Sequence, residues 1–230
     1  MSEPDLMTRL LAAAAMHVPF DGWSETTLRL AAEDAGIAPG LVAAICPRGA
    51  VDLALAYHAA GDAAMLKRLA EADLSSLRFR DRVAFAVRAR LEAVEDRELV
   101  RRGMTLFSLP PYAADGARAL WQTADHIWVA LGDTSEDVNW YTKRATLSGV
   151  YGATVLYWLG DDSEGQTRTW EFLDRRIEDV MQIEKLKAQA RDNRWMSGLM
   201  AAGPLNFLSR IRAPQASAQT GMPGRWNRPN

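Results

Sequence analysis

The three histidines of this 230-residue chain are the side chains best able to bind a metal ion or to move a proton at neutral pH. A di-iron carboxylate bundle needs Glu-x-x-His pairs, in which a glutamate precedes the histidine by three residues. His17, His58 and His126 all lack that glutamate. Asp125 is only a sequence neighbour of His126. We therefore predict neither a metal site nor the chemistry of a di-iron hydroxylase.

A glycine-rich segment and a charged helix are the other patterns that could serve catalysis. Gly198 to Gly203 has the spacing of a P-loop, but Pro204-Leu205 replaces the Lys-Ser/Thr pair that would hold phosphate and magnesium. No serine lies in a nucleophile elbow. Acids and bases alternate at helical spacing over residues 168–179, which favours an ion-paired, solvated face. We predict no catalytic residues and no cofactor, although a lone carboxylate with a shifted pKa stays open.

The composition is typical of a globular helical protein. Hydrophobic residues make up 48% and charged residues 24% of the chain, and Ala, Leu, Arg and Glu dominate the apolar segments. Cys46 is the only cysteine, so one chain can form neither a disulfide nor a cysteine-based zinc site. We find no signal-like start and no run of roughly 18 apolar residues, and we expect an intracellular protein.

Helix-start and helix-stop signals predict an all-α chain. Ser24 is the expected N-cap of the second helix, and Gly36 is its expected end. The Pro19-to-Gly22 turn should end the first helix. The predicted helices cover residues 4–17, 25–35, 39–46, 49–60, 77–95, 98–108, 116–131, 136–159 and 166–191.

Residues 132–163 contain the most aromatic of these helices. Thr134 with Asp137, and Ser163 with Gln166, fit capping boxes that would begin two successive helices. One face collects small and apolar residues, which we predict to lie in the core: Tyr141, Ala145, Ser148, Gly152, Val155 and Leu159. The other face is either core as well, or a ligand cavity or partner surface: Trp140, Arg144, Leu147, Tyr151, Thr154 and Trp158.

Several stretches resemble one protein family. GDTSEDVNWYTKRATLSGVY at 132–151 and TWEFLDRRIEDV at 169–180 are similar to the ubiquinone-biosynthesis accessory lipid-binding proteins of the Coq-nine family. HVPFDGWSETTLRLAAEDAGI at 17–37 and FAVRARLEAV at 85–94 extend the resemblance. It implies a TetR-like fold, an isoprenoid lipid bound in the larger helical domain, and assistance to a hydroxylase acting on demethoxyubiquinone. By position in the motif, it also implies a partner-binding surface at Asp137, Trp140, Tyr141 and Arg144.

A TetR-like transcriptional regulator with a hydrophobic ligand is the alternative. The stretch 27–37 follows a TetR-like helix-turn-helix pattern, but the recognition segment 38–46, APGLVAAIC, offers no base-reading side chain and no cation. Residues 1–77 hold ten acidic and five basic residues, a net charge of −5. Such a module is repelled by the DNA backbone, so we predict that it does not bind nucleic acid.

A lipid site is predicted along two helices of the larger domain. Each methylene shielded there from water would contribute about 0.8 kcal/mol to binding. The alternative for every lining residue is plain core packing. The expected lining is Leu120, Ile127, Trp128 and Leu131 on one helix, and Tyr151, Leu156 and Trp158 on the other.

The end of the chain is basic and amphipathic. Residues 184–230 hold eight basic and two acidic residues, a net charge of +6. This mixture predicts docking on an anionic membrane, although the segment could instead cap the core or carry an oligomer contact. The predicted membrane-contacting residues are Arg191, Arg194, Trp195, Leu199, Phe207, Leu208 and Ile211.

Together these patterns predict an all-α, TetR-regulator-like protein. The expected parts are a degenerate helix-turn-helix module at 1–75, a lipid- and partner-binding helical domain at 76–191, a membrane-contacting segment at 192–212 and a disordered tail at 213–230. We expect a non-catalytic accessory protein of ubiquinone biosynthesis, cytoplasmic and peripheral on the inner membrane. Its partner would be demethoxyubiquinone hydroxylase or a related ubiquinone-pathway hydroxylase, di-iron or flavin-dependent. Whether two copies form a homodimer is open.

Overall fold

The computed structural model describes residues 5–192, with side chains described through Gln182. Within this range the chain is helical and contains no strand, which confirms the predicted all-α class. The helices are α1 (Leu6–Asp21), α2 (Glu25–Asp34), α3 (Pro39–Ile45), α4 (Ala50–Glu71), α5 (Phe79–Glu92), α6 (Arg97–Ser108), α7 (Ala113–Ala130), α8 (Val138–Leu159), the 3-10 turn η1 (Glu164–Gln166) and α9 (Thr167–Asp192).

Two helices run further than their sequence signals predicted. α1 continues through Pro19 to Asp21, and Gly22, at a φ of 67°, follows as its C-cap. α4 continues past residue 60 to Glu71. Gly61 lies inside α4, where it leaves room for the Arg90 side chain. A Cβ at residue 61 would lie 2.5 Å from the Arg90 guanidinium carbon, so only glycine lets this side chain approach the helix so closely.

The helix starts follow capping chemistry. The Ser24 hydroxyl accepts a hydrogen bond from the Thr27 amide at 3.2 Å, as predicted for α2. The predicted Thr134 box is wrong, because Asp137 itself is the N-cap of α8 and its carboxylate accepts from the Asn139 amide at 2.9 Å. The second predicted box is also displaced: the 3-10 turn η1 intervenes, and α9 begins only at Thr167.

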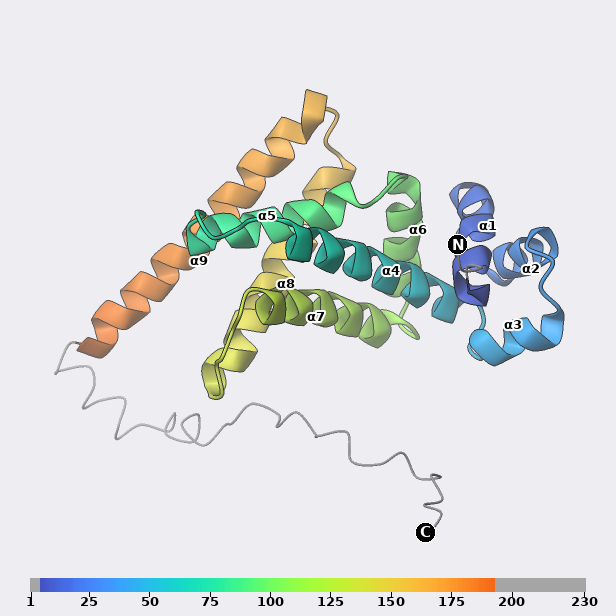
Figure 1. The fold of residues 1–230 in the computed structure, drawn as a ribbon, viewed down its shortest axis with the longest axis horizontal. Coiled ribbons are helices and arrows are strands. Elements are labelled where there is room, and N and C mark those ends of the chain that lie inside the picture. The colour runs from blue at the N-terminus through green and yellow to red at the C-terminus, as the bar shows by residue number, and fades with distance from the viewer. Residues whose placement is uncertain (1–4, 193–230) are drawn as a thin grey trace, which may run out of the picture.

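Two hydrophobic clusters hold the described helices together. The first lies among α1, α2, α3 and the start of α4, which gather at one end of the molecule (Figure 1), and it also includes Leu99 of α6. The second lies among α4, α5, α7, α8 and α9. α4 supplies Leu53 to the first cluster and Met65 to the second, so it joins both parts, and the predicted boundary at residue 75 falls in the loop that follows it.

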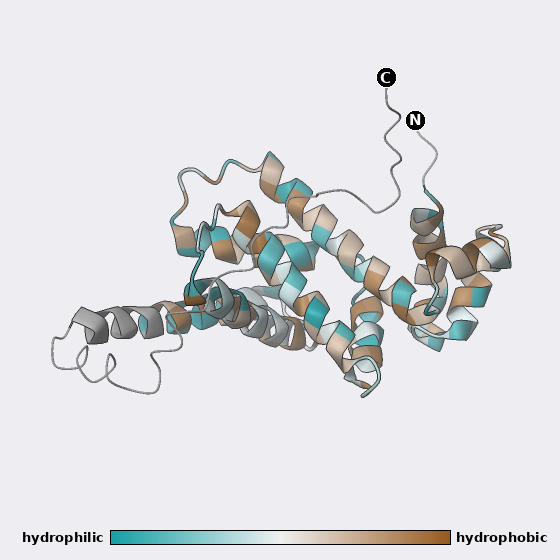
Figure 2. Ribbon diagram, turned by 90° about the horizontal axis from the view of Figure 1, so that it is seen from below, coloured by the Kyte–Doolittle hydropathy of each residue, from teal (hydrophilic) through white to brown (hydrophobic). Residues whose placement is uncertain are grey.

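Hydrophilic and hydrophobic residues alternate along the helices in Figure 2. Within residues 5–192, no single helix is both long and apolar enough to cross a membrane. The bent pair α3 and α4, which meet at 61°, satisfies the length and composition criteria only when the two helices are taken together.

Candidate functional site

The buried face of α8 is the face that the sequence left open. Leu147, Tyr151, Thr154 and Trp158 are all buried. The predicted core face is mostly wrong, because only Val155 of its members is buried and Ala145 is exposed. The face with the larger side chains is the buried one because α8 packs against both α7 and α9, and large side chains are needed to fill the space between three helices.

An apolar cavity of about 390 Å³, which we call the inner cavity, lies among α4, α5, α6, α7 and α8. Two of the predicted lipid-lining residues, Leu120 of α7 and Tyr151 of α8, are part of its wall. Gly152 belongs to the same wall, and a Cβ built there would lie 3.8 Å from Leu120 Cδ1. The other apolar wall residues include Leu91, Val100, Met104, Phe107 and Val155.

One part of the inner cavity is polar. Tyr57, His58, Arg90 and Tyr151 line it. Arg90 is 4% exposed, and its Nε donates to the Asp62 carboxylate at 2.7 Å, while its Nη2 donates to the His58 carbonyl at 3.0 Å. Burial, reinforced by the Arg90 charge, lowers the pKa of His58 to about 4, so this ring is neutral at pH 7.

Asp62 explains how an arginine can be buried here. Its carboxylate also accepts from the Thr123 hydroxyl at 2.9 Å and lies 3.1 Å from His126 Nδ1. The sequence analysis missed this cluster, since its members are spread over α4, α5 and α7. The i, i+4 spacing of His58 and Asp62 was the one local signal available.

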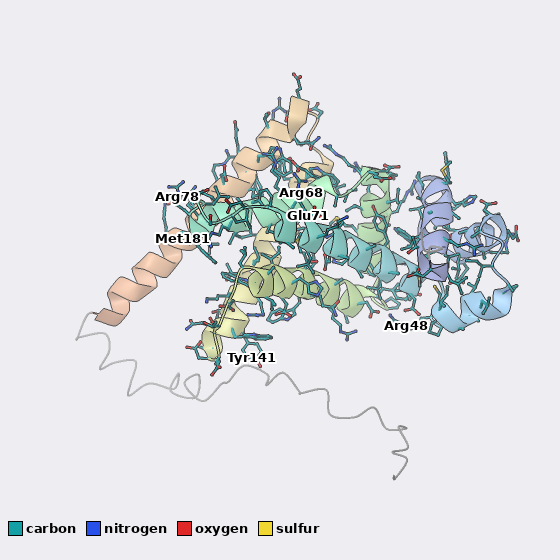
Figure 3. The ribbon with its side chains drawn as sticks, viewed as in Figure 1. Arg48, Arg68, Glu71, Arg78, Tyr141 and Met181 are labelled. Carbon is teal, nitrogen blue, oxygen red and sulfur yellow. The ribbon has the colours of Figure 1, made fainter. Side chains whose placement is uncertain are left out.

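A second apolar cavity of about 340 Å³, the outer cavity, lies among α5, α7, α8 and α9. Trp128 is the predicted lipid-lining residue found here, and its ring stacks on Phe79 with centroids 5.5 Å apart. Asn139 and Lys143 line the same cavity from the first turns of α8. Its α9 wall includes Met181, which is labelled in Figure 3. The same figure labels Tyr141 near the N-terminal end of α8.

The remaining predicted lining residues contact neither cavity. Ile127 is fully buried in the core, and Leu131 packs at the edge of that core. Trp158 is 3% exposed and lies beneath the Arg97 guanidinium at 4.7 Å. Leu156 is 62% exposed, so its assignment as a lining residue is wrong. It lies one helical turn after Gly152, but it lines neither cavity.

Three aromatic side chains, Trp121, Trp140 and Tyr141, form what we call the aromatic patch. The Trp121 ring lies 5.9 Å from Trp140 and 6.4 Å from Tyr141, and the Trp140 and Tyr141 rings meet edge to face at 4.8 Å. All three are partly exposed. Asp137 is exposed next to them. Two predicted partner-binding residues are thus joined by Trp121, which the sequence analysis did not single out.

Arg144 is not a surface residue, and its assignment to an exposed partner surface is wrong. Its side chain is 2% exposed, and it bonds Asp125 at 2.5 Å, Asp133 at 3.0 Å and the Trp140 carbonyl at 3.2 Å. The guanidinium also lies 4.0 Å from the centre of the Trp140 ring. Arg144 therefore supports the aromatic patch from below rather than contacting a partner.

Asp133 completes this support. Burial would raise the pKa of Asp133, but hydrogen bonds from Lys143, Ser135 and Arg144 lower it to about 2. The carboxylate is consequently ionised at neutral pH, and it holds the loop before α8 against Lys143 and Arg144.

The helix-turn-helix module presents little charge to a nucleic acid. In α3 the exposed residues include Gly40, Leu41 and Ala43, none of which can read a base edge. Nearby cations are paired, Arg29 with Glu33 at 2.8 Å and Arg48 with Asp115 at 3.1 Å.

The predicted membrane contacts lie outside the described residues, apart from Arg191, which belongs to α9 but whose side chain is not described. No group of three or more metal-binding side chains occurs within the described range.

Comparisons with known proteins agree with this picture. Residues 113–184 match the family model COQ9. The ubiquinone biosynthesis protein COQ9, mitochondrial, of Drosophila melanogaster is 31% identical over 80% of this chain and 58% of its own length. The rat protein of that name is 28% identical over 87% of this chain and 67% of its length. The chain thus spans about three fifths to two thirds of these relatives.

The fold has a solved counterpart. A TetR transcriptional regulator from Nitrosomonas europaea superposes with a TM-score of 0.62 and 17% identity, covering 77% of this chain and 98% of the regulator. The predicted fold and resemblance are confirmed: the chain is similar to COQ9 proteins over most of its length and has a TetR-like helical fold.

Proposed function

We propose that this protein is a non-catalytic accessory protein of ubiquinone biosynthesis, which binds an isoprenoid lipid and presents it to a membrane-associated hydroxylase. The names of the COQ9 relatives support the pathway in this proposal. The observation that carries lipid binding is the inner cavity, whose wall is largely apolar and whose volume of about 390 Å³ fits the range of small-molecule sites.

The affinity of such a site comes from apolar burial. A prenyl segment that places about ten carbons in the cavity gains about 8 kcal/mol before the entropic cost of ordering the chain. A long isoprenoid would be only partly enclosed, and the rest would stay in a membrane or against a partner. The protein is therefore suited to hold one end of the lipid.

The aromatic patch supports the partner role. Partly exposed Trp and Tyr side chains are enriched among the residues that dominate protein interfaces. Trp140 is held by the buried Arg144, so it would enter a complex with little loss of side-chain freedom. The predicted partner is demethoxyubiquinone hydroxylase or a related hydroxylase. A location on the inner membrane is part of the same proposal.

The outer cavity offers a second place for the lipid. Asn139 and Lys143 face it, whereas Trp140 and Tyr141 on the same turns of α8 form the patch. A lipid there would lie next to the partner surface. The inner cavity is preferred because it offers more volume together with a polar end.

Mass spectrometry of lipid extracted from the purified protein tests the proposal. We expect an isoprenoid quinone or its precursor in stoichiometric amount. Protein that carries no isoprenoid, and that instead retards specific DNA in a gel shift, would contradict the proposal and favour a TetR-like regulator.

A further inference from the structure

The mouth of the inner cavity can be located from the exposure of the residues that line it. Most of these residues are buried or partly buried, and three are exposed: Ser108, Ala113 and Ala117. All three lie where α6 ends and α7 begins, on either side of the connecting loop 109–112. Their side chains are small, so they take up little of the opening. The inner cavity therefore reaches the surface at the α6–α7 connection.

The loop that borders this mouth is apolar. Residues 103–114 carry no charged side chain. Leu109 is 48% exposed, and Pro110 and Pro111 are exposed beside it. Tyr112 is partly exposed and has the kind of amphipathic ring that settles between an apolar and an aqueous phase. An exposed apolar segment at the mouth of a cavity indicates a surface that meets an apolar partner.

The backbone of the loop can leave water at little cost. Pro110 and Pro111 have no amide hydrogen. The Leu109 amide donates to the Leu106 carbonyl at 3.1 Å, and the Tyr112 amide donates to the Leu109 carbonyl at 2.9 Å. Each amide hydrogen of the loop thus has an acceptor within the protein. Because an unpaired donor is costly in hydrocarbon, this pairing favours insertion of the loop into a lipid layer.

The two helices that carry the loop are in close contact at its base. A Cβ at residue 116 would lie 2.6 Å from Phe107 Cβ, so glycine lets Phe107 of α6 pack directly against α7. A short loop between two helix ends that are held together has little conformational freedom to lose when it docks.

We propose that loop 109–112 inserts into the surface of a lipid bilayer, and that lipid passes from the membrane into the inner cavity between Ser108, Ala113 and Ala117. This inference rests on the proposed lipid binding and adds the surface through which the lipid arrives. A bilayer fits better than a protein partner because an apolar molecule could enter the mouth without crossing water. The contact needs no anionic lipid, unlike the contact predicted for the basic end of the chain.

An environment-sensitive label on the full-length protein tests the membrane contact. Cys46 is the only cysteine, so Cys46→Ala allows a single nitrobenzoxadiazole label on Leu109→Cys. Phosphatidylcholine vesicles at high salt suppress the contribution of basic side chains. We expect the emission to shift to the blue and to be quenched by doxyl lipids. Leu41→Cys is the matched control, because Leu41 is also 48% exposed but lies on α3, and its label should keep an aqueous emission.

A charge in the loop tests the same contact without a label. Leu109→Asp should weaken binding to the phosphatidylcholine vesicles by about tenfold or more, since one leucine side chain no longer leaves water. Leu41→Asp should leave vesicle binding unchanged. Thermal melts check that both variants fold. An unshifted label at residue 109, or equal effects at residues 109 and 41, would overturn the proposed contact.

A bulky side chain at the mouth tests the entry route. Ala117→Phe should narrow the opening, whereas Ala114→Phe is the matched control, because Ala114 is exposed one turn earlier in α7 but does not line the cavity. Stopped-flow quenching of tryptophan fluorescence follows uptake of geranyl-1,4-benzoquinone from the vesicles, since Trp23 lines the cavity. Ala117→Phe should slow uptake and release alike, by about tenfold or more, and leave the equilibrium affinity unchanged.

The outcomes separate this inference from the proposed function. If the wild type binds no quinone from vesicles or from solution, the proposed lipid binding fails, and the entry route fails with it. If the wild type takes up the quinone while Ala117→Phe and Ala114→Phe behave alike, lipid binding stands and the mouth is elsewhere. A loss of affinity in Ala117→Phe without slower release would also overturn the entry route.

Discussion

Gly152 offers a way to fill the inner cavity without disturbing the fold. It lies in the middle of α8, and the nearest atom to a Cβ placed there is Leu120 Cδ1 at 3.8 Å, an ordinary contact. A Cβ at residue 152 therefore fits without a clash, and the helical backbone there suits any L residue. The four additional carbons of Gly152→Leu would occupy the space that we assign to the prenyl tail.

The expected effects have opposite signs for stability and binding. Replacing a mid-helix glycine stabilises by about 0.5–1 kcal/mol, and burying a leucine side chain adds about 1.5–3 kcal/mol. The free energy of unfolding should therefore rise by about 2–4 kcal/mol. Lost room for about four carbons should weaken a prenyl ligand by about 3 kcal/mol, or about 100-fold in Kd.

Gly149→Leu is the matched control. Gly149 is on the same helix but exposed, and nothing lies within 4 Å of a Cβ there. This variant should gain only the helix contribution of about 0.5–1 kcal/mol and bind the lipid normally. Thermal melts and titration with geranyl-1,4-benzoquinone measure both quantities. A Gly152→Leu protein that is folded and binds the probe with wild-type affinity would refute the assignment of the inner cavity.

Four further predictions follow from the site. Trp140→Ala should weaken hydroxylase binding by about 2 kcal/mol or more with a smaller effect on folding, as measured by calorimetry; a large drop in melting temperature with normal binding by the remaining folded protein would make Trp140 a core residue. Arg144→Ala should lower the free energy of unfolding by about 3 kcal/mol, because it leaves Asp133 buried with one partner fewer. The control Arg29→Ala breaks an exposed ion pair and should lower it by less than about 1 kcal/mol. Denaturant titration measures both values, and equal losses would contradict the buried role of Arg144. The folded-state pKa of Asp133 is depressed from 3.8 to about 2, so the stabilisation from this carboxylate is present above pH 3.8 and is lost as the pH falls toward 2. The difference in unfolding free energy between wild type and Asp133→Asn should therefore shrink over that pH range. A constant difference would contradict a stabilising role of the ionised Asp133. Substituting Arg29 and Arg48 should leave quinone output unchanged, and salt-sensitive, sequence-specific retardation of DNA by the wild type in a gel shift would overturn the non-DNA assignment.

The fold was predictable because its signals are local. Caps such as Ser24 and helix-forming segments specify elements one at a time, and the structure confirms nine of them. The errors arose where a residue serves a distant partner. The predicted helix 49–60 stopped one residue before Gly61, which lies inside α4 and leaves room for Arg90, 29 positions later in the chain.

The site was only partly predictable for the same reason. Periodicity identified two faces of α8 but not which neighbours each face would meet, so Tyr151 was correctly predicted to line a cavity whereas Leu156 was placed wrongly. A motif match proposed Arg144 as a contact residue, whereas its burial depends on Asp125 and Asp133 across a turn. The Asp62 cluster needed three helices to be assembled before it could be recognised.

Photo-crosslinking with a prenyl lipid that carries a diazirine at the end of its tail tests the central claim most directly. Mass mapping of the labelled peptides distinguishes the two cavities. The account predicts labels on inner-cavity positions such as Leu120, Gly152 and Val155 in the wild type, and their loss in Gly152→Leu. Labels confined to Phe79 and Trp128 of the outer cavity would contradict it.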